Sequence, residues 1–224
     1  MCFSANASFI ASAVIGSGGV ATLLKVNKRN QILFGVIPML FAIQQFSEGL
    51  IWGTLRGAGK DKTNFIATTV YILFARVLWP TLAPLAVYFL ETNITRKRVI
   101  LAIACAGASI SCYLLACLLA NGYSSEILCC SHIGYASNIP YGNIVKWLYL
   151  AVVCLPFFCF SNRKFAIYGF LWFLSFIVSD SWYRTAFESV WCFFAAILSI
   201  TIYAYLKYEK ELFSPEPPAK AKNI

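Results

Sequence analysis

The sequence predicts an all-α, polytopic membrane protein whose fold is a bundle of seven transmembrane helices. Hydrophobic residues make up 60% of the 224-residue chain and charged residues only 12%, which is more apolar than a typical water-soluble domain. Seven apolar stretches are each long enough to cross the roughly 30 Å hydrocarbon core of a bilayer, which takes about 20 helical residues. The connections between them are short, so we expect one compact bundle without a separate soluble domain.

The seven helices are expected, in chain order, at residues 7–25, 31–54, 65–90, 99–120, 144–161, 165–183 and 186–206. The first stretch lacks a basic start and a clean cleavage site, so we interpret it as a retained helix rather than a signal peptide. Small residues in this helix, "ASAVIGSGGVA", and in the fourth, "CAGASISC", permit close helix approach. We expect residues 1–206 to form a single transmembrane domain and residues 207–224 a basic, proline-containing cytoplasmic tail.

Prolines interrupt three of the expected helices. Trp79-Pro80 and Pro84 fall in the middle of the third helix, where proline removes backbone hydrogen bonds and bends a helix. Pro38 and Pro156 have similar positions in the second and fifth helices. Carbonyl groups freed at such bends can line a cavity.

The last two helices carry polar residues near their expected outer ends. Asp180 lies near the end of the sixth helix, and Glu188 and Cys192 lie near the start of the seventh. The seventh helix has no lysine at mid-membrane depth to form a retinal Schiff base. The sequence therefore disfavours a rhodopsin despite the number of helices.

Basic residues are sorted by loop, and this sorting predicts the orientation. Most of the 18 Lys and Arg residues follow the first, third, fifth and seventh helices, whereas residues 121–143 contain none. The positive-inside rule then places the N-terminus outside and the C-terminus in the cytoplasm. Because topology accounts for the formal net charge of +9, we expect no nucleic-acid partner.

The segment "FAIQQFSEGLIW" raises the question of what satisfies a carboxylate inside an apolar helix. Glu48 lies about 9 Å below the expected outer end of the second helix, beside Gln44 and Gln45. A charge at such a depth costs at least about 2.5 to 3.5 kcal/mol, so it should face the bundle and find a partner. We expect Glu48 to be held by Arg76 or by the glutamines, or to be protonated, in a pocket open to the outer side.

The expected orientation gathers the other unusual residues of the spanning helices in the same leaflet. Together with the segment around Glu48 they form the predicted binding site. Its members are Gln44, Gln45, Glu48, Arg76, Trp79, Asp180, Glu188 and Cys192.

A catalytic or metal-binding role requires residues outside the helices. Cys2 or Ser4 as nucleophile and His132 as base, oriented by Glu48 or Asp180, would compose a hydrolytic site, although no motif such as G-x-S-x-G supports it. Zinc or copper ligand types are also present, but at spacings that are not diagnostic. The candidate ligands are Cys2, Cys129, Cys130, His132 and Cys192. We predict no cofactor, and a metal ion stays an alternative.

Five segments carry a resemblance to a known family. The opening "MCFSANASF", then "QQFSEGLIW", "VLWPTLAP", "HIGY" and "SVWCFFAAILS" resemble an uncharacterised family of small bacterial membrane proteins that begin Met-Cys-Phe-Ser. The resemblance covers nearly the whole chain and implies the same fold and a bacterial cytoplasmic membrane, but no activity. Arg76 stands where the resemblance leads us to expect histidine in many members.

Three classes of function stay open from the sequence. Transport or binding of a small ion or solute is favoured, because it requires only a polar pocket and kinked helices. A membrane-embedded enzyme acting on a lipid or lipid-linked substrate, and a structural or assembly protein, are the alternatives. The expected partners are membrane lipids and a small ion, solute or lipid ligand, and a homo-oligomer is a further expectation.

Overall fold

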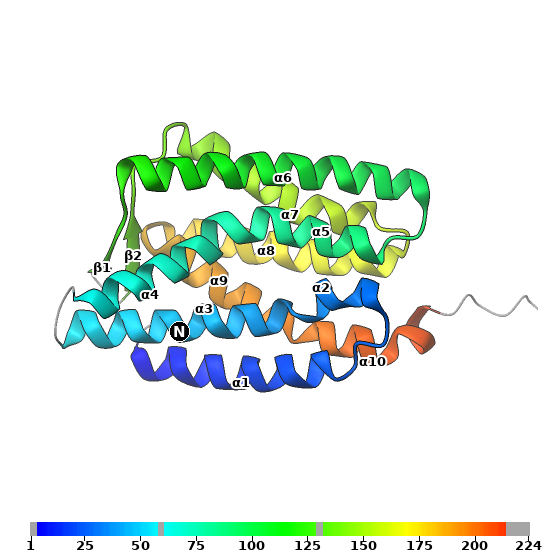
Figure 1. Cartoon of the computed structure of the whole chain (residues 1–224), viewed down its shortest axis with the longest axis horizontal. Helices are drawn as coiled ribbons and strands as arrows, with labels where there is room; N and C mark the ends of the chain where they lie inside the picture. The colour runs from blue at the N-terminus through cyan, green and yellow to red at the C-terminus, as the bar shows by residue number, and fades with distance from the viewer. Residues whose placement is uncertain (1–3, 58–60, 129–131, 214–224) are drawn as a thin grey trace, which may run out of the picture.

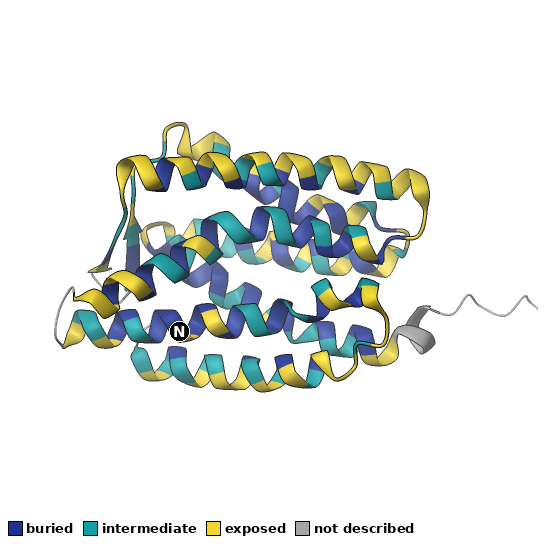
Figure 2. Ribbon diagram, viewed as in Figure 1, coloured by how far each residue is buried: buried dark blue, intermediate teal, exposed yellow. Residues whose placement is uncertain are grey.

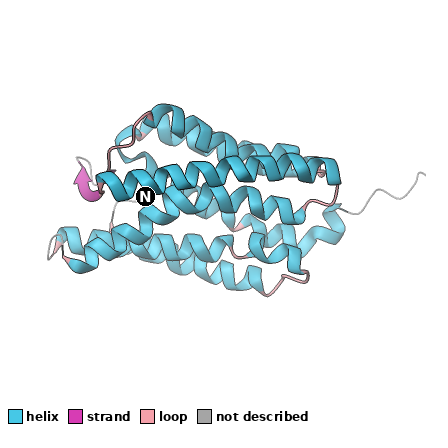
Figure 3. Ribbon diagram, turned by 45° about the horizontal axis from the view of Figure 1, so that its top comes forward, coloured by secondary structure: helices cyan, strands magenta, loops and turns pink. Residues whose placement is uncertain are grey.

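The computed structural model describes residues 4–57, 61–128 and 132–213, and these form an elongated bundle of helices (Figure 1). Seven segments are long and apolar enough to cross a membrane, which confirms the predicted all-α seven-helix class. The spanning segments are Ala5–Leu23, Arg29–Arg56, Lys62–Leu90, Ile94–Asn121, Gly142–Cys159, Arg163–Trp182 and Arg184–Tyr208. In Figure 3 the helices run the length of the bundle, with a single strand pair at one end.

Several spanning segments are composed of more than one element. The helices are α1 (Ala5–Leu23), α2 (Ile32–Gly35), α3 (Ile37–Arg56), α4 (Lys62–Ile72), α5 (Trp79–Leu90), α6 (Ile94–Asn121), α7 (Gly142–Cys159), α8 (Ala166–Trp182), α9 (Phe187–Ser199) and α10 (Thr201–Phe213). Short 3-10 turns at η1 (Arg29–Gln31), η3 (Arg163–Phe165) and η4 (Arg184–Ala186) begin the second, sixth and seventh spanning segments. Pro38 lies in the first turn of α3, so the chain bends between α2 and α3 rather than within a helix.

The loop after α6 contains a β-hairpin, which the sequence prediction missed. Gly122 ends α6 with φ of 69°, a backbone conformation that favours glycine. Strands β1 (Ser124–Leu128) and β2 (His132–Ala136) then pair antiparallel, with Ser124 opposite Ala136. We call the end of the bundle that carries these strands the hairpin end.

The opposite end of the bundle carries the loops rich in Lys and Arg, and we call it the basic end (Figure 1). Glu91 links two loops at this end. Its carboxylate accepts hydrogen bonds from the backbone N–H groups of Thr92, Asn93 and Ser161 and from the Ser161 hydroxyl, at 2.7 to 2.8 Å. Burial alone would raise the pKa of Glu91, but these hydrogen bonds outweigh it and lower the pKa. Glu91 therefore joins the α5–α6 turn to the end of α7 as a carboxylate.

Small residues allow neighbouring helices to pack at short distances, as the sequence predicted. A Cβ on Gly19 of α1 would lie 2.9 Å from the Met39 backbone nitrogen of α3. A Cβ on Gly107 of α6 would collide with the carbonyl oxygen of Pro80 in α5. These contacts bring α1 against α3 and α6 against α5. Apolar residues such as Ile10 and Leu119 are exposed, as lipid-facing residues are. Figure 2 shows exposed residues along the outer faces of the helices.

The third spanning segment changes its helical pitch in the middle. Residues Leu73–Leu78 form a π-helix, η2, directly before Pro80. The Ala75 carbonyl accepts a hydrogen bond from the Tyr149 hydroxyl at 2.6 Å, and the Val77 carbonyl accepts one from Ser111 at 2.6 Å. Side chains of α7 and α6 therefore satisfy these two carbonyl groups, as expected for irregular backbone at membrane depth.

Orientation in the membrane is testable at the two ends of the bundle. We expect a cysteine at Thr95, on the basic end, to react with a membrane-impermeant maleimide only after cells are permeabilised, because basic loops remain in the cytoplasm. A cysteine at Glu126, exposed in β1, is the matched control and should react in intact cells. The reverse labelling pattern would place the hairpin end in the cytoplasm.

Candidate functional site

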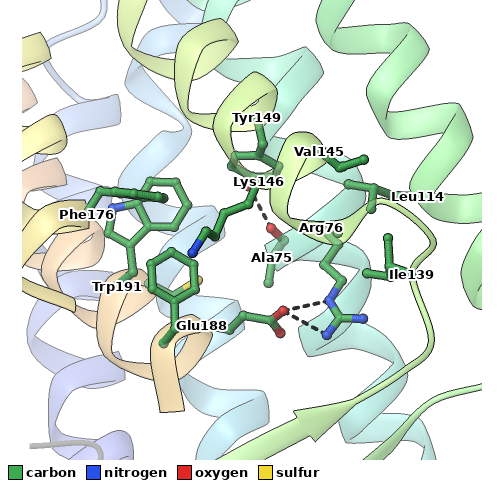
Figure 4. A pocket seen from close by; sticks show the side chains of 13 residues that line it. Ala75, Arg76, Leu114, Ile139, Val145, Lys146, Tyr149, Phe176, Glu188 and Trp191 are labelled. Carbon is green, nitrogen blue, oxygen red and sulfur yellow. Dashed lines mark hydrogen bonds and ion pairs between the residues drawn. The ribbon is translucent and has the colours of Figure 1, made fainter. Parts of the chain in front are cut away.

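A cavity of about 170 Å³ lies near the hairpin end, where η2 and helices α6, α7, α8 and α9 meet. Its walls are mostly apolar and aromatic, and three charged side chains, Arg76, Lys146 and Glu188, reach it (Figure 4). The apolar lining residues are Ala75, Leu114, Ile139, Gly142, Val145, Tyr149, Phe176, Phe187, Trp191 and Cys192. A concave apolar site with a few convergent polar groups is the usual form of a small-molecule site.

Arg76 connects three elements at one side of this cavity. Its Nε and one terminal nitrogen lie 2.9 and 2.8 Å from Oε1 of Glu188 on α9. The same terminal nitrogen donates to the Tyr135 carbonyl of β2 at 3.1 Å, and the other terminal nitrogen donates to the Ser137 hydroxyl. The expectation that Arg76 holds Glu48 is therefore wrong, because the guanidinium is engaged by α9 and the hairpin.

Lys146 of α7 reaches the cavity from another side. Its Nζ lies 2.6 Å from Asp180 Oδ1, and it lies 5.7 and 6.0 Å from the ring centres of Phe187 and Phe176. A second cavity of about 360 Å³ adjoins the first, because Lys146 and Phe187 line both, and it also contains Asp180 and Arg184. Asp180 thus belongs to the entrance region of the candidate site.

The aromatic side chains form walls that face the cavity in different directions. The ring centres of Phe176 and Trp191 are 5.2 Å apart at 89°, and those of Phe176 and Phe187 are 5.1 Å apart at 76°. Tyr149 packs against Trp191 at 5.5 Å and is fixed by its hydrogen bond to Ala75. Such edge-to-face packing makes a rigid wall with exposed π-faces.

Two buried polar atoms at the cavity have no hydrogen-bond partner within the part of the chain that the structure describes. They are Oε2 of Glu188 and Nε1 of Trp191, which lie one helical turn apart on α9. One accepts and the other donates a hydrogen bond, so a bound molecule can satisfy both.

The remaining predicted binding residues form a second group deeper in the bundle. Glu48 is fully buried, and the Ser189 hydroxyl of α9 donates a hydrogen bond to it. Gln44 accepts a hydrogen bond from Trp79 Nε1 at 2.9 Å, and Gln45 lies fully buried beside them on α3. The predicted site is thus divided between the cavity, with Arg76, Asp180, Glu188 and Cys192, and this buried group.

Each of the catalytic candidates that the structure describes has a contact of its own. Ser4 accepts a hydrogen bond from the Ala7 N–H and so caps α1, while Asp180 pairs with Lys146. His132 lies on β2, where its ring packs edge-on against Tyr183 at 5.5 Å, and partial burial lowers the pKa of His132.

Cys2, Cys129 and Cys130 lie outside the described residues. Among residues 4–57, 61–128 and 132–213, no three His, Cys, Asp or Glu side chains come close enough to hold a metal ion.

Several residues of the site were not selected from the sequence. They are Lys146, Tyr149, Phe187 and Ser189, none of which stands out in the sequence. One usable signal was present, since Glu188 and Trp191 are three residues apart and so share a face of α9. The contribution of Lys146 and Tyr149 depends on how α7 packs against α9.

The chain belongs to a family of unknown function (DUF6629), whose model matches residues 1–215. This match confirms the resemblance to an uncharacterised family that the sequence segments indicated. No curated protein and no solved structure matches the chain.

Proposed function

We propose that this multi-pass membrane protein binds a small solute that has an apolar body and a head group able to donate a hydrogen bond. The observation that carries the proposal is the aromatic cavity with the partly paired Glu188 at its edge. This is a form of the solute-binding function that the sequence favoured, and the expected orientation would open it toward the outer side.

The size of the cavity limits the size of the solute. A dry cavity of about 150 Å³ in another protein accommodates benzene, so a cavity of about 170 Å³ suits a single ring or a short alkyl chain. The lining of Leu114, Val145 and Trp191 supports an apolar body of this size. Helices α6, α7, α8 and α9 would surround this apolar body with mostly apolar side chains.

The charges at the cavity favour a donor head group over an anionic one. Arg76 and Lys146 are already paired with Glu188 and Asp180, whereas Oε2 of Glu188 is available within the described part of the chain. An amine or alcohol can donate to this oxygen, and the π-faces of the surrounding rings also attract an ammonium group. A carboxylate would instead lie beside a second carboxylate.

The other two classes receive less support from the geometry. For the enzyme class, Ser4 caps α1, His132 packs against Tyr183 and Asp180 pairs with Lys146, and none of these contacts points to hydrolysis. A structural or assembly role accounts for the tight helix packing at Gly19 and Gly107, but it does not explain a cavity bordered by unpaired polar atoms.

Three probes with the same ring test the proposal. We expect benzylamine and benzyl alcohol to bind the protein in lipid nanodiscs with one site per chain, and benzoate to bind at least about tenfold more weakly, a difference of about 1.4 kcal/mol. Isothermal titration calorimetry, with empty nanodiscs subtracted, measures these affinities.

A pair of variants on α7 separates cavity binding from partition into the lipid. Val145→Phe places a ring in the cavity and should weaken benzylamine binding at least about tenfold, because the apolar body loses its space. Leu148→Phe, at a side chain that is 51% exposed on the same helix, should leave binding unchanged. Equal binding by both variants, or tightest binding of benzoate, would contradict the proposal.

A further inference from the structure

The buried group around Glu48 contains polar atoms that the described residues leave unsatisfied. Glu48 and Gln45 are fully buried, and Ser8 is 2% exposed. Oε2 of Glu48, both amide atoms of Gln45 and the Ser8 hydroxyl have no hydrogen-bond partner within the described part of the chain. Buried polar groups are nearly always satisfied, so these atoms point to an additional bound species.

The neighbours of Glu48 come from α3, α9 and β2. Gln45 and Glu48 are three residues apart on one face of α3, and Ser189 of α9 donates to Glu48. The Tyr135 hydroxyl of β2 also faces this carboxylate.

Ser8 of α1 lies on the same side. The Ser12 hydroxyl donates to the Ala42 carbonyl at 2.8 Å, and Gly49 packs against Phe9. Helices α1 and α3 run antiparallel (Figure 1). Moving one turn along α1 from Ser12 back to Ser8 therefore corresponds to moving one turn forward along α3 from Ala42 to about Gln45. Ser8 therefore lies opposite the turn that begins at Gln45.

The group has one acidic charge and, within the described residues, no basic side chain paired with it. Arg76, the nearby cation of the third spanning segment, is engaged by Glu188, Tyr135 and Ser137. The side-chain oxygen atoms of Gln45, Ser8 and Ser189 are uncharged ligand atoms of the kind that hard cations prefer. A carboxylate at this depth is unfavourable as a charge, and one bound monovalent cation would neutralise it.

We propose that Glu48, Gln45, Ser8 and Ser189 form a buried site for one alkali-metal cation. The Glu48 carboxylate supplies the compensating charge, and the amide and hydroxyl oxygens complete the coordination together with water, which also accepts from the Gln45 N–H groups. A divalent ion is disfavoured because a single carboxylate leaves one positive charge uncompensated. This site is distinct from the solute cavity, although the consecutive residues Glu188 and Ser189 contribute one side chain to each.

Ion-dependent stability of the full-length protein in zwitterionic nanodiscs tests the site. Choline chloride is replaced by LiCl, NaCl or KCl at constant ionic strength, and the melting temperature Tm is measured at each concentration. We expect at least one alkali cation to raise Tm along a one-site saturation curve, since a ligand that binds only the folded state stabilises it by mass action. Choline is too large for a buried site and should give no such rise.

Variants assign the response to these residues. Glu48→Gln should abolish the saturable rise, and Ser8→Ala should weaken the apparent cation affinity about tenfold. Ser12→Ala, which removes a hydroxyl one turn away on α1, is the matched control and should keep the wild-type affinity.

The wild-type curve and Ser8→Ala decide the question even if Glu48→Gln fails to fold. The proposal is overturned if no alkali cation raises Tm above choline, which would leave water as the bound species. It is also overturned if Ser8→Ala retains the wild-type cation affinity.

Discussion

Arg76→Gln is expected to lower the free energy of unfolding by about 3 kcal/mol. The substitution leaves the Glu188 carboxylate without its cation and removes the donors to the Tyr135 carbonyl and the Ser137 hydroxyl. The side chain of Arg76 is only 8% exposed, so water cannot replace these contacts well. Unfolding in mixed micelles with increasing dodecyl sulfate, followed by circular dichroism, measures the loss.

A second substitution shows how much of this loss comes from the ion pair. Glu188→Gln alone should also lower the free energy of unfolding. In the Arg76→Gln background the same substitution should lower it by at least about 1 kcal/mol less than in the wild type, because it removes the stranded charge. Arg98→Gln, at an exposed position of the basic end, is the control and should change stability by no more than about 0.5 kcal/mol. Strictly additive losses would show that the pair contributes no coupling.

Gly107→Ala is expected to destabilise the bundle by roughly 3 kcal/mol through overpacking. The added methyl group would collide with the Pro80 carbonyl oxygen, which belongs to the backbone of α5 and cannot rotate away. Helices α5 and α6 must therefore separate, which also strains the hydrogen bond from Ser111 to the Val77 carbonyl. The same dodecyl sulfate titration measures this effect.

Gly53→Ala is the matched control for this prediction. Gly53 also lies inside a long helix, α3, but nothing lies within 4 Å of the position that its Cβ would occupy. Alanine should therefore stabilise the protein by about 0.5 to 1 kcal/mol through its higher helix propensity. A stabilising effect of both substitutions would show that α5 and α6 are not held at the close distance that the structure gives.

The partner of Glu48 in the structure is Ser189, whereas Arg76 is among the partners that the sequence leads us to expect. The sequence identified a buried carboxylate on the second spanning segment and a buried guanidinium on the third, and it paired them because both were expected in the outer half of the bilayer. Depth alone does not decide pairing, because each side chain also has a direction around its helix axis. The packing of α9 turns Ser189 toward Glu48 and Glu188 toward Arg76.

The cavity shows the same limitation. Glu188 and Cys192 are predicted site residues, whereas Lys146 and Tyr149 are not, because a lysine near a helix start and a tyrosine in an apolar helix are ordinary residues in a membrane-protein sequence. Their contribution became visible only from the arrangement of α7 beside α8 and α9. Asp180 is a predicted member of the binding site, and the structure supplies its partner, Lys146.

The sequence by itself determined the features that depend on local composition. Seven apolar segments follow from the length needed to cross a bilayer, and the small residues of α1 and α6 permit close helix approach because glycine lacks a Cβ. Only the tertiary structure decided the β-hairpin, the π-helix before Pro80 and the division of the polar residues between the cavity and the Glu48 group. The π-helix and the division of the polar residues involve hydrogen bonds between residues far apart in the chain, such as Tyr149 with Ala75 and Ser189 with Glu48. Helical periodicity does not encode the relative rotation of the helices that forms them.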